Sequence, residues 1–269
     1  FTNPITGTNP NTSNPYTTGQ TVNANITVSG IGRGSGITGQ NVNNAYSASG
    51  WNSSSINFND YYEFTLTPNS CYYINFSSFT YTSALSSGSA NYAFRSSIDN
   101  YASDIATYTT NAGSTIDLSG LSFQNITSSI TFRLYCWNAN SSGRTFRIND
   151  FSFTGSVNNA VPVFSTQPIS ATVCQNASVT PVSIVASAGG GTISMYQWYS
   201  NASNSNTGGT AISGANWLSY YPSSSSAGTT YYYCTVTNSL GCSTSSNAAY
   251  LTVTPQPSGN FAYSAAGFC

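Results

Sequence analysis

The sequence predicts an all-β protein built from two β-sandwiches, and three observations indicate this class. Short apolar–polar alternations recur along the chain, separated by glycine, asparagine and serine turns. No stretch shows the apolar spacing of an amphipathic helix. Cys234 follows Trp198 by 36 positions (234 − 198) and is preceded two positions earlier by Tyr232. A tryptophan on an earlier strand and a Tyr-x-Cys on a later one are typical of an immunoglobulin-like sandwich.

Residues 1–157 are predicted to form a jelly-roll-like sandwich, one of the folds that carbohydrate-binding modules use. Residues 1–20 are expected to be an extended arm, and 30–50 a loop. The expected strands are 22–28, 62–66, 71–81, 90–98, 129–137 and 145–154. Shifts of the alternation near Phe79 and near Asn149 predict bulges or bends.

Residues 158–257 are predicted to form the immunoglobulin-like domain, after a linker at 155–162. Strands are expected at 182–188, 195–199, 210–212, 217–221, 229–238 and 243–254. Trp198, Tyr232 and Cys234 are assigned to the core, and Trp217 is expected to pack rather than to bind. Residues 258–269 follow a second stiff linker and are interpreted as the start of a further, truncated repeat.

Charged residues are scarce: they make up 4% of the chain, against roughly 25% in an average soluble protein. The sequence contains no Lys or His, and no Asp, Glu or Arg follows Asp150. A surface of Ser, Thr, Asn, Gly and Tyr stays hydrated through neutral groups, so its behaviour should depend little on salt.

This composition excludes several classes of function. A net charge of −1 without a basic cluster offers no footprint for nucleic acid. Chemistry that depends on histidine, and zinc sites of the Cys/His kind, lack their residues. No apolar run reaches the ~18–20 residues that span a bilayer, so membrane insertion by this segment is not expected. The chain has no initiating Met or signal peptide and is therefore expected to be a segment of something longer.

The six cysteines favour an oxidising, extracellular setting. Cys71 and Cys136 are the natural pair in the first domain, although Cys71 is out of phase with its strand. The strand-B position that pairs with Cys234 in antibody domains holds no cysteine. We therefore expect a Cys174–Cys242 bond with Cys234 as a buried thiol, and Cys174–Cys234 as the alternative. Cys269 is expected to pair beyond this segment.

Arg133, Tyr135 and Trp137 alternate with the core residues of strand 129–137 and share its other face. Aromatic faces stack on the C–H face of a sugar ring, and polar groups bond its hydroxyls, so this face is a candidate glycan site. Trp51, in the preceding loop, is a candidate fourth member. The competing interpretation is that a loop covers this face or that it is simply solvated.

No catalytic residue is predicted, and the chain is not expected to be an enzyme. The pairs Asp60/Glu63 and Asp99/Asp104 match the residue types of a glycosidase, but nothing in the pattern positions or tunes them. No cofactor is expected, except that Asp60, Glu63 and Asp150 are weak candidate ligands for a structural calcium ion.

Several stretches resemble the immunoglobulin-like repeats of large Bacteroidota cell-surface proteins exported by type IX secretion, including gliding-motility adhesins of the SprB kind. They are Thr172–Val182, Tyr196–Asn201, Gly208–Ala215, Gly228–Cys234 and Gly241–Ser243. In the first domain, Asn9–Tyr16, Asn59–Phe64 and Phe146–Phe151 are similar to an N-terminal sandwich of such proteins, and 261–269 resembles another repeat start.

The resemblance implies a secreted, cell-surface protein that meets the type IX machinery during export. It also implies a non-enzymatic role in adhesion or gliding motility, with an N-terminal sandwich carried on an immunoglobulin-like stalk and an extracellular glycan or surface as partner. The alternative is a carbohydrate-binding accessory region of a secreted polysaccharide-degrading enzyme. A third hypothesis is a filament subunit that pairs through its sheet edges.

Overall fold

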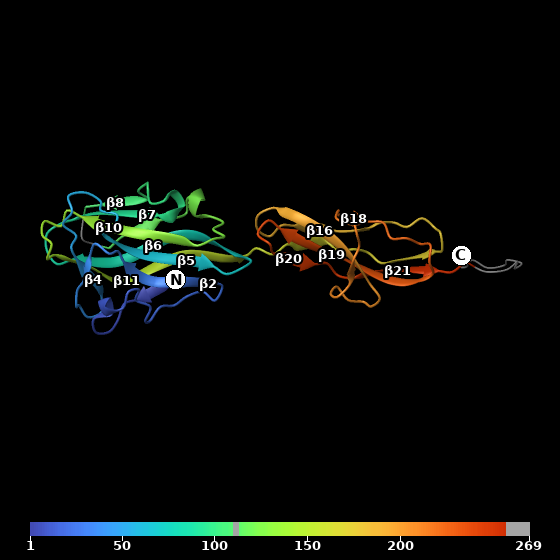
Figure 1. Cartoon of the computed structure of the whole chain (residues 1–269), viewed down its shortest axis with the longest axis horizontal. Coiled ribbons are helices and arrows are strands. Elements are labelled where there is room, and N and C mark those ends of the chain that lie inside the picture. Colours follow the sequence, from blue (N-terminus) through green and yellow to red (C-terminus); the bar gives the residue numbers. More distant parts are fainter. Residues whose placement is uncertain (110–112, 257–269) are drawn as a thin grey trace, which may run out of the picture. The chain divides into compact units, whose positions relative to one another are not determined.

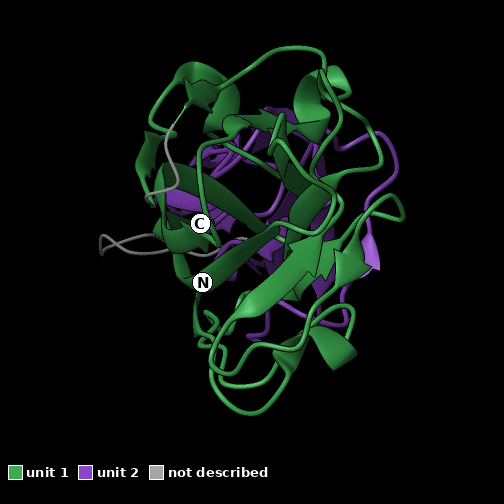
Figure 2. Cartoon of the chain, turned by 90° about the vertical axis from the view of Figure 1, so that its left-hand side faces the viewer, with its two compact units in different colours: residues 1–158 green, residues 159–269 purple. Residues whose placement is uncertain are grey.

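The computed structural model describes residues 1–109 and 113–256, and in them the chain is almost entirely β-structure (Figure 1). The helical elements there are three short 3-10 turns: η1 (Pro10–Thr12), η2 (Ser97–Asp99) and η3 (Leu121–Phe123). The chain divides into two compact units, Phe1–Asn158 and a second that begins at Asn159 (Figure 2). The predicted all-β sandwich class is confirmed.

Two mainly antiparallel sheets form the first unit. The first sheet has the order β2 (Ile26–Arg33), β5 (Tyr61–Pro68), β10 (Ile130–Trp137), β7 (Asn91–Ser96), β8 (Ala106–Tyr108). The second has the order β3 (Thr38–Gly39), β4 (Tyr46–Ser49), β11 (Thr145–Asn159), β6 (Tyr72–Leu85), β9 (Thr115–Asp117), and β1 (Thr2–Pro4) also pairs with β11. From β2 onward the chain passes back and forth between the two sheets, as in double-sheet jelly rolls. The exceptions are β3–β4 and β7–β8, which are consecutive strands of the same sheet.

The core of the first unit is an aromatic layer between the two sheets. Phe64 on β5 lies 5.1 Å from Phe79 and 4.7 Å from Phe151 of the opposite sheet, measured between ring centroids. Phe132 on β10 stacks on Phe94 of the neighbouring strand at 5.3 Å. Burial of such rings supplies most of the stabilisation of a sandwich that is poor in charges.

Several predicted elements shift. The expected strand 22–28 begins only at Ile26, and the expected loop 30–50 contains the end of β2 together with β3 and β4. All four residues of β4 are buried, so this strand has no solvent-facing side to mark it by alternation. The expected arm 1–20 is partly a strand, because β1 pairs with β11. The predicted phase shift in 71–81 is present, since Phe76 and Phe79 are both buried.

The second unit has the strand arrangement of an immunoglobulin-like sandwich. Its main sheet has the order β13 (Ala171–Cys174), β21 (Ala249–Thr254), β19 (Gly228–Asn238), β16 (Ile193–Asn201), β17 (Thr210–Ala211), with β20 (Ser243–Ser245) also on β19. Two short pairs complete it: β12 (Val163–Thr166) with β15 (Val185–Ser187), and β14 (Val182–Ser183) with β18 (Ser219–Tyr220). Strand β13 runs parallel to β21.

Trp198 and Cys234 face each other across β16 and β19 and are fully buried. Tyr232 also belongs to this core cluster, so the three predicted core residues are confirmed. The predicted third segment, 258–269, lies outside the described residues.

The set of cysteines that form disulfide bonds differs from the predicted set. Cys71, Cys174 and Cys242 are disulfide-bonded, whereas Cys136 and Cys234 are buried thiols. The predicted Cys71–Cys136 bond and the alternative Cys174–Cys234 bond are therefore wrong. Cys136 lies among core residues of the first unit, and Cys71 stands before β6 with a φ of 61°. The prediction that Cys234 is a buried thiol is confirmed.

The predicted Cys174–Cys242 bond does not fit the second unit. Cys174 lies opposite Thr254, beside the point where Gly228 begins β19. The amide of Asn238, at the other end of β19, donates to the carbonyl of Cys242. Ten residues of strand separate the two ends by about 33 Å, whereas a disulfide needs Cα atoms within about 7 Å. Strand β13 lies at the edge beside β21, and its parallel direction places Cys174 at the end of the sheet away from Cys242.

Candidate functional site

The face that β10 presents away from the core carries a cluster of aromatic and arginine side chains. The guanidinium carbon of Arg133 lies 3.9 Å from the Tyr61 ring centroid and 4.1 Å from the Tyr101 ring centroid. Its Nε donates to Glu63 on β5 at 3.3 Å. Arg133 is thus held between two aromatic rings and neutralised by a carboxylate, and each contact stabilises a cation on a half-buried surface.

Arg95 repeats this arrangement on the neighbouring strand β7, directly opposite Arg133. Its Nε donates to Asp104 at 2.5 Å, and a second nitrogen donates to the carbonyl of Tyr101 at 2.9 Å. Its guanidinium carbon lies 5.8 Å from the centre of the Tyr135 ring. The two arginines lie side by side without an unbalanced charge, because each has its own carboxylate.

The predicted glycan residues occupy different depths on this face. Tyr135 is fully buried, because Tyr61 lies edge-on against it at 5.7 Å and Phe58 covers it at 6.0 Å. Phe58 itself is 56% exposed, and Trp137 at the end of β10 is half-buried. Phe58 is therefore the most exposed aromatic side chain of the face, and Tyr61 and Tyr101 are half-buried like Trp137. Sequence reasoning missed Phe58, because it precedes the strand and follows no alternation.

Trp51 does not belong to this face. It is fully buried in the core of the first unit, where its ring packs edge-on against Tyr62 at 5.1 Å and Phe146 at 5.7 Å. Its indole nitrogen donates to the carbonyl of Ala48 at 2.7 Å. A buried tryptophan whose single donor is satisfied has a structural role, so its assignment to the glycan site is wrong.

The three candidate calcium ligands are not brought together. Glu63 accepts from Arg133, and Asp150 on the other sheet accepts from Thr82 at 2.7 Å. Asp60 is buried and accepts from Ser53 at 2.9 Å. In the part of the chain that the structure describes, no group of three or more Asp, Glu, Cys or His side chains is placed to hold a metal. The predicted calcium set therefore does not form.

The two carboxylate pairs considered for glycosidase chemistry are held by other contacts. A glycosidase raises the pKa of one carboxyl group of its pair so that this group can donate a proton. Asp99 instead accepts the backbone amides of Ala102 and Ser103, and hydrogen bonds from Ser103 above all lower its pKa. Asp104 is paired with Arg95, and Glu63 is paired with Arg133.

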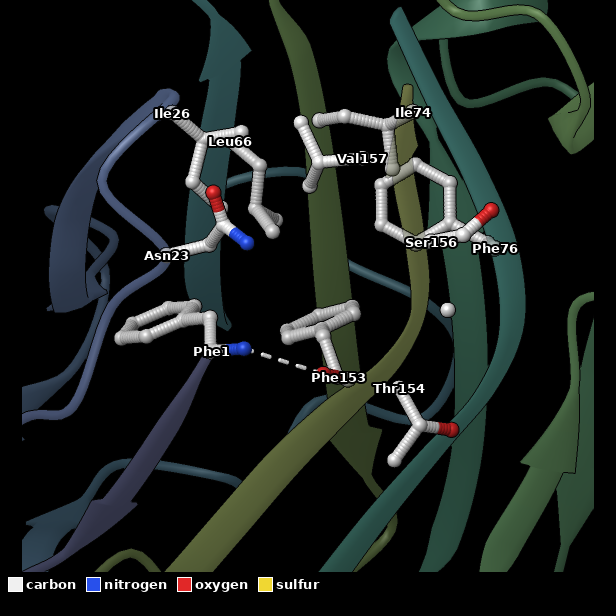
Figure 3. Close-up of a pocket in the computed structure, with 11 residues that line it drawn as sticks. Phe1, Asn23, Ile26, Leu66, Ile74, Phe76, Phe153, Thr154, Ser156 and Val157 are labelled. Carbon is white, nitrogen blue, oxygen red and sulfur yellow. Dashed lines mark hydrogen bonds between the residues drawn. The ribbon is translucent and has the colours of Figure 1, made fainter.

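The first unit also has a pocket of about 200 Å³, lined by residues from β2, β5, β6 and β11 and from the chain before β2 (Figure 3). Phe1 and Phe153 stack across it at 6.2 Å, and Ile26, Leu66 and Phe76 supply further apolar wall. The backbone nitrogen of Phe1 donates to the carbonyl of Phe153 at 3.1 Å. The polar side chains that line the pocket, Asn23, Thr154 and Ser156, are neutral, so its wall is a mixture of apolar and uncharged polar groups.

The second unit carries an aromatic group that the sequence analysis misjudged. Trp217 is 74% exposed, although it was expected to pack. Tyr221, four positions later, is also exposed, while Tyr220 packs on Trp198 and Tyr232. Trp217 and Leu218 lie in a bend before β18, and both are exposed, so strand alternation does not predict the position of Trp217.

Comparisons with known proteins add little to this geometry. Residues 165–255, within the second unit, match a family described as "Domain of unknown function (DUF8696)". A search of curated proteins found no match. The described part of the chain contains no helix that is both long and apolar enough to cross a membrane.

Two solved structures share a distant likeness. One is a beta-1,2-glucanase from Parabacteroides distasonis, with 12% identity, a TM-score of 0.23 and coverage of 87% of this chain. The chain spans 37% of that protein's length. The other is the adhesin domain of Epf from Streptococcus pyogenes, with 8% identity, a TM-score of 0.24 and coverage of 84% and 82% of the two chains. At such TM-scores neither likeness carries an argument about function.

Proposed function

We propose that this chain is a non-enzymatic, adhesive and structural segment of a large secreted bacterial cell-surface protein. In this proposal the first unit is a jelly-roll-like sandwich that attaches to an extracellular glycan or surface, and the second is an immunoglobulin-like repeat of a stalk. Secretion by the type IX route and a part in gliding adhesion remain proposals that rest on the sequence resemblance.

The observation that carries the proposal is the outer face of the sheet around β10. Its two arginines are paired with Glu63 and Asp104, which leaves a neutral surface with the exposed Phe58 and the half-buried rings of Trp137, Tyr61 and Tyr101. A neutral face with exposed aromatic rings suits the stacking of uncharged sugar rings. The disulfide-bonded Cys71, Cys174 and Cys242 support an oxidising, extracellular location.

A glycan screen with matched variants tests the proposal. Trp137→Ala should abolish retention on the glycans that bind through this face, with a nearly unchanged melting temperature because the side chain is not part of the core. Phe58→Ala should weaken it as well. Retention of both variants at the wild-type level would refute binding through this face.

The alternative function is a carbohydrate-binding accessory region of a secreted polysaccharide-degrading enzyme, which would use the same face. The two functions differ in what adjoins the segment in the full-length protein. Further repeats support the adhesive stalk, and a catalytic domain supports the accessory region.

A further inference from the structure

The outer face of the smaller strand pairs in the second unit carries a row of exposed apolar side chains. Val185 on β15 pairs with β12 on one side. On the other side, the amide of Ile184 donates to the carbonyl of Leu218 at 3.0 Å, which continues the antiparallel register of β14 and β18. Trp217 precedes Leu218 in a bend before β18, and the side chains of Trp217 and Val185 are both exposed.

Trp217 is held in place although it is exposed. The indole nitrogen of the buried Trp198 donates to the carbonyl of Trp217 at 2.9 Å. The backbone of Trp198 also donates to Ala215 and accepts from Ile212, at 2.9 and 3.0 Å. Three hydrogen bonds from one core residue therefore fix the segment that ends at Trp217. A ligand that stacks on this ring would order little of the protein, and preorganisation of this kind lowers the entropic cost of binding.

The neighbours of Trp217 on this face are neutral and partly polar. Ser219 and Tyr221 follow it at alternate positions, and Ser219 lies opposite Ser183. Leu218, between Trp217 and Ser219, is also exposed. The chain carries no Asp, Glu, Lys, Arg or His after Asp150, so no ligand can be recognised by its charge.

These features decide between classes of ligand. A protein partner needs a contiguous, desolvated apolar centre, and the serines interrupt one here. An anionic polymer needs basic groups, which this unit lacks. An uncharged sugar chain needs aromatic faces for its C–H surfaces and nearby hydroxyls for its own hydroxyls, and this face supplies both.

We propose that this face binds an uncharged polysaccharide, with sugar rings stacked on Trp217 and Tyr221 and hydrogen bonds to the hydroxyls of Ser183 and Ser219. This site and the Trp137 face belong to different units, so an experiment can refute one of the two sites without refuting the other. The immunoglobulin-like unit then contributes to attachment as well as to length.

The test uses the whole chain in affinity electrophoresis against a panel of uncharged polysaccharides: a β-glucan, a dextran, a mannan and a xylan. Trp217→Ala should weaken retention about tenfold, the size of effect that 1.4 kcal/mol of lost stacking produces. Tyr221→Ala should weaken it less. Tyr250→Ala, which changes an exposed tyrosine on β21 of the main sheet, should leave retention unchanged.

Retention should also be equal at about 0.05 M and about 1 M NaCl, because no charge is involved. Trp217→Phe keeps a stacking ring and should restore part of the binding. The proposal is overturned if no member of the panel is retained or if Trp217→Ala binds as the wild type does. It is also overturned if heparin, the anionic polymer run beside the panel, is the only polysaccharide retained. Sedimentation showing a dimer that Trp217→Ala dissociates would assign the face to a second copy and also overturn it.

Discussion

The guanidinium carbon of Arg133 lies 3.9 Å from the centre of the Tyr61 ring, closer than any other cation–aromatic contact measured among the described residues. The opposite side of the guanidinium meets Tyr101, which joins the loop after η2 to the face of the sheet. One arginine thus links β5, β10 and that loop. In a chain with five arginines and no lysine, the residue type itself matters, because a planar guanidinium stacks on two rings whereas an ammonium does not.

Arg133→Lys should therefore destabilise the first unit although it preserves the charge. We expect a loss of about 1–2 kcal/mol in the free energy of unfolding, from the stacking on both rings. Chemical denaturation followed by tyrosine fluorescence measures it. The matched control is Arg144→Lys, since Arg144 donates to the carbonyl of Ser87 and the structure shows no ring against it in the described residues. Equal midpoints for the two variants would contradict the assigned role.

Much of the first unit could be predicted because most of its strands have one solvated face. In β10 the alternation of Phe132, Arg133, Leu134 and Tyr135 predicted both the core and the outer face. Strand β4 could not be found in this way, because Tyr46 to Ser49 are buried on both sides. Alternation marks a strand only when its two faces meet different environments.

The candidate sites were harder to predict than the strands. The face of Arg133 followed from periodicity, but the depth of Tyr135 depends on Phe58, which folds over it from a loop. Trp51 was misassigned for the same reason, since position in a loop does not reveal burial. The predicted Cys174–Cys242 bond was wrong because β13 runs parallel to β21. The residues near Cys174 do not indicate whether this strand runs parallel or antiparallel to its neighbour.

Gly189 offers a test of backbone packing in the second unit. It has a φ of +72°, and a Cβ at this position would lie 1.9 Å from the carbonyl oxygen of Val161. Gly189→Ala should cost about 2–4 kcal/mol, since it combines left-handed strain with a backbone clash. Gly208 has the same φ with nothing within 4 Å of the added atom, so Gly208→Ala should cost only about 1–2 kcal/mol. Thermal unfolding of both variants measures the difference, and equal losses would show that the contact with Val161 does not matter.

The two buried thiols should be inert in the folded protein. Burial raises the pKa of Cys234 to about 12 and also raises the pKa of Cys136. Both side chains are almost completely inaccessible, and the thiolate is the reactive form. A maleimide reagent at pH 8 should leave both unmodified until denaturant is added, as peptide mapping would detect. Stoichiometric modification of Cys234 under native conditions would show that β19 opens easily. The same map should contain no peptide pair linked through Cys71 and Cys136.

The side chains should contribute almost no pH dependence of stability between about pH 5 and 8, because the sequence has no histidine and the side chains with shifted pKa values titrate outside this range. Burial raises the folded-state pKa of Tyr62, Tyr92 and Cys136, so their contribution is complete below the unfolded-state values. It declines above about pH 8.5–10, where the unfolded chain releases these protons and the folded chain retains them. Hydrogen bonds from Ser103 and Ser119 lower the pKa of Asp99 and Asp117, so their contribution is lost as the pH falls below about 4.

Denaturation midpoints from pH 3 to 11 measure this profile, and Tyr92→Phe should make the alkaline decline shallower. A steep slope between pH 5 and 8, or an alkaline decline unchanged in Tyr92→Phe, would contradict the assignment.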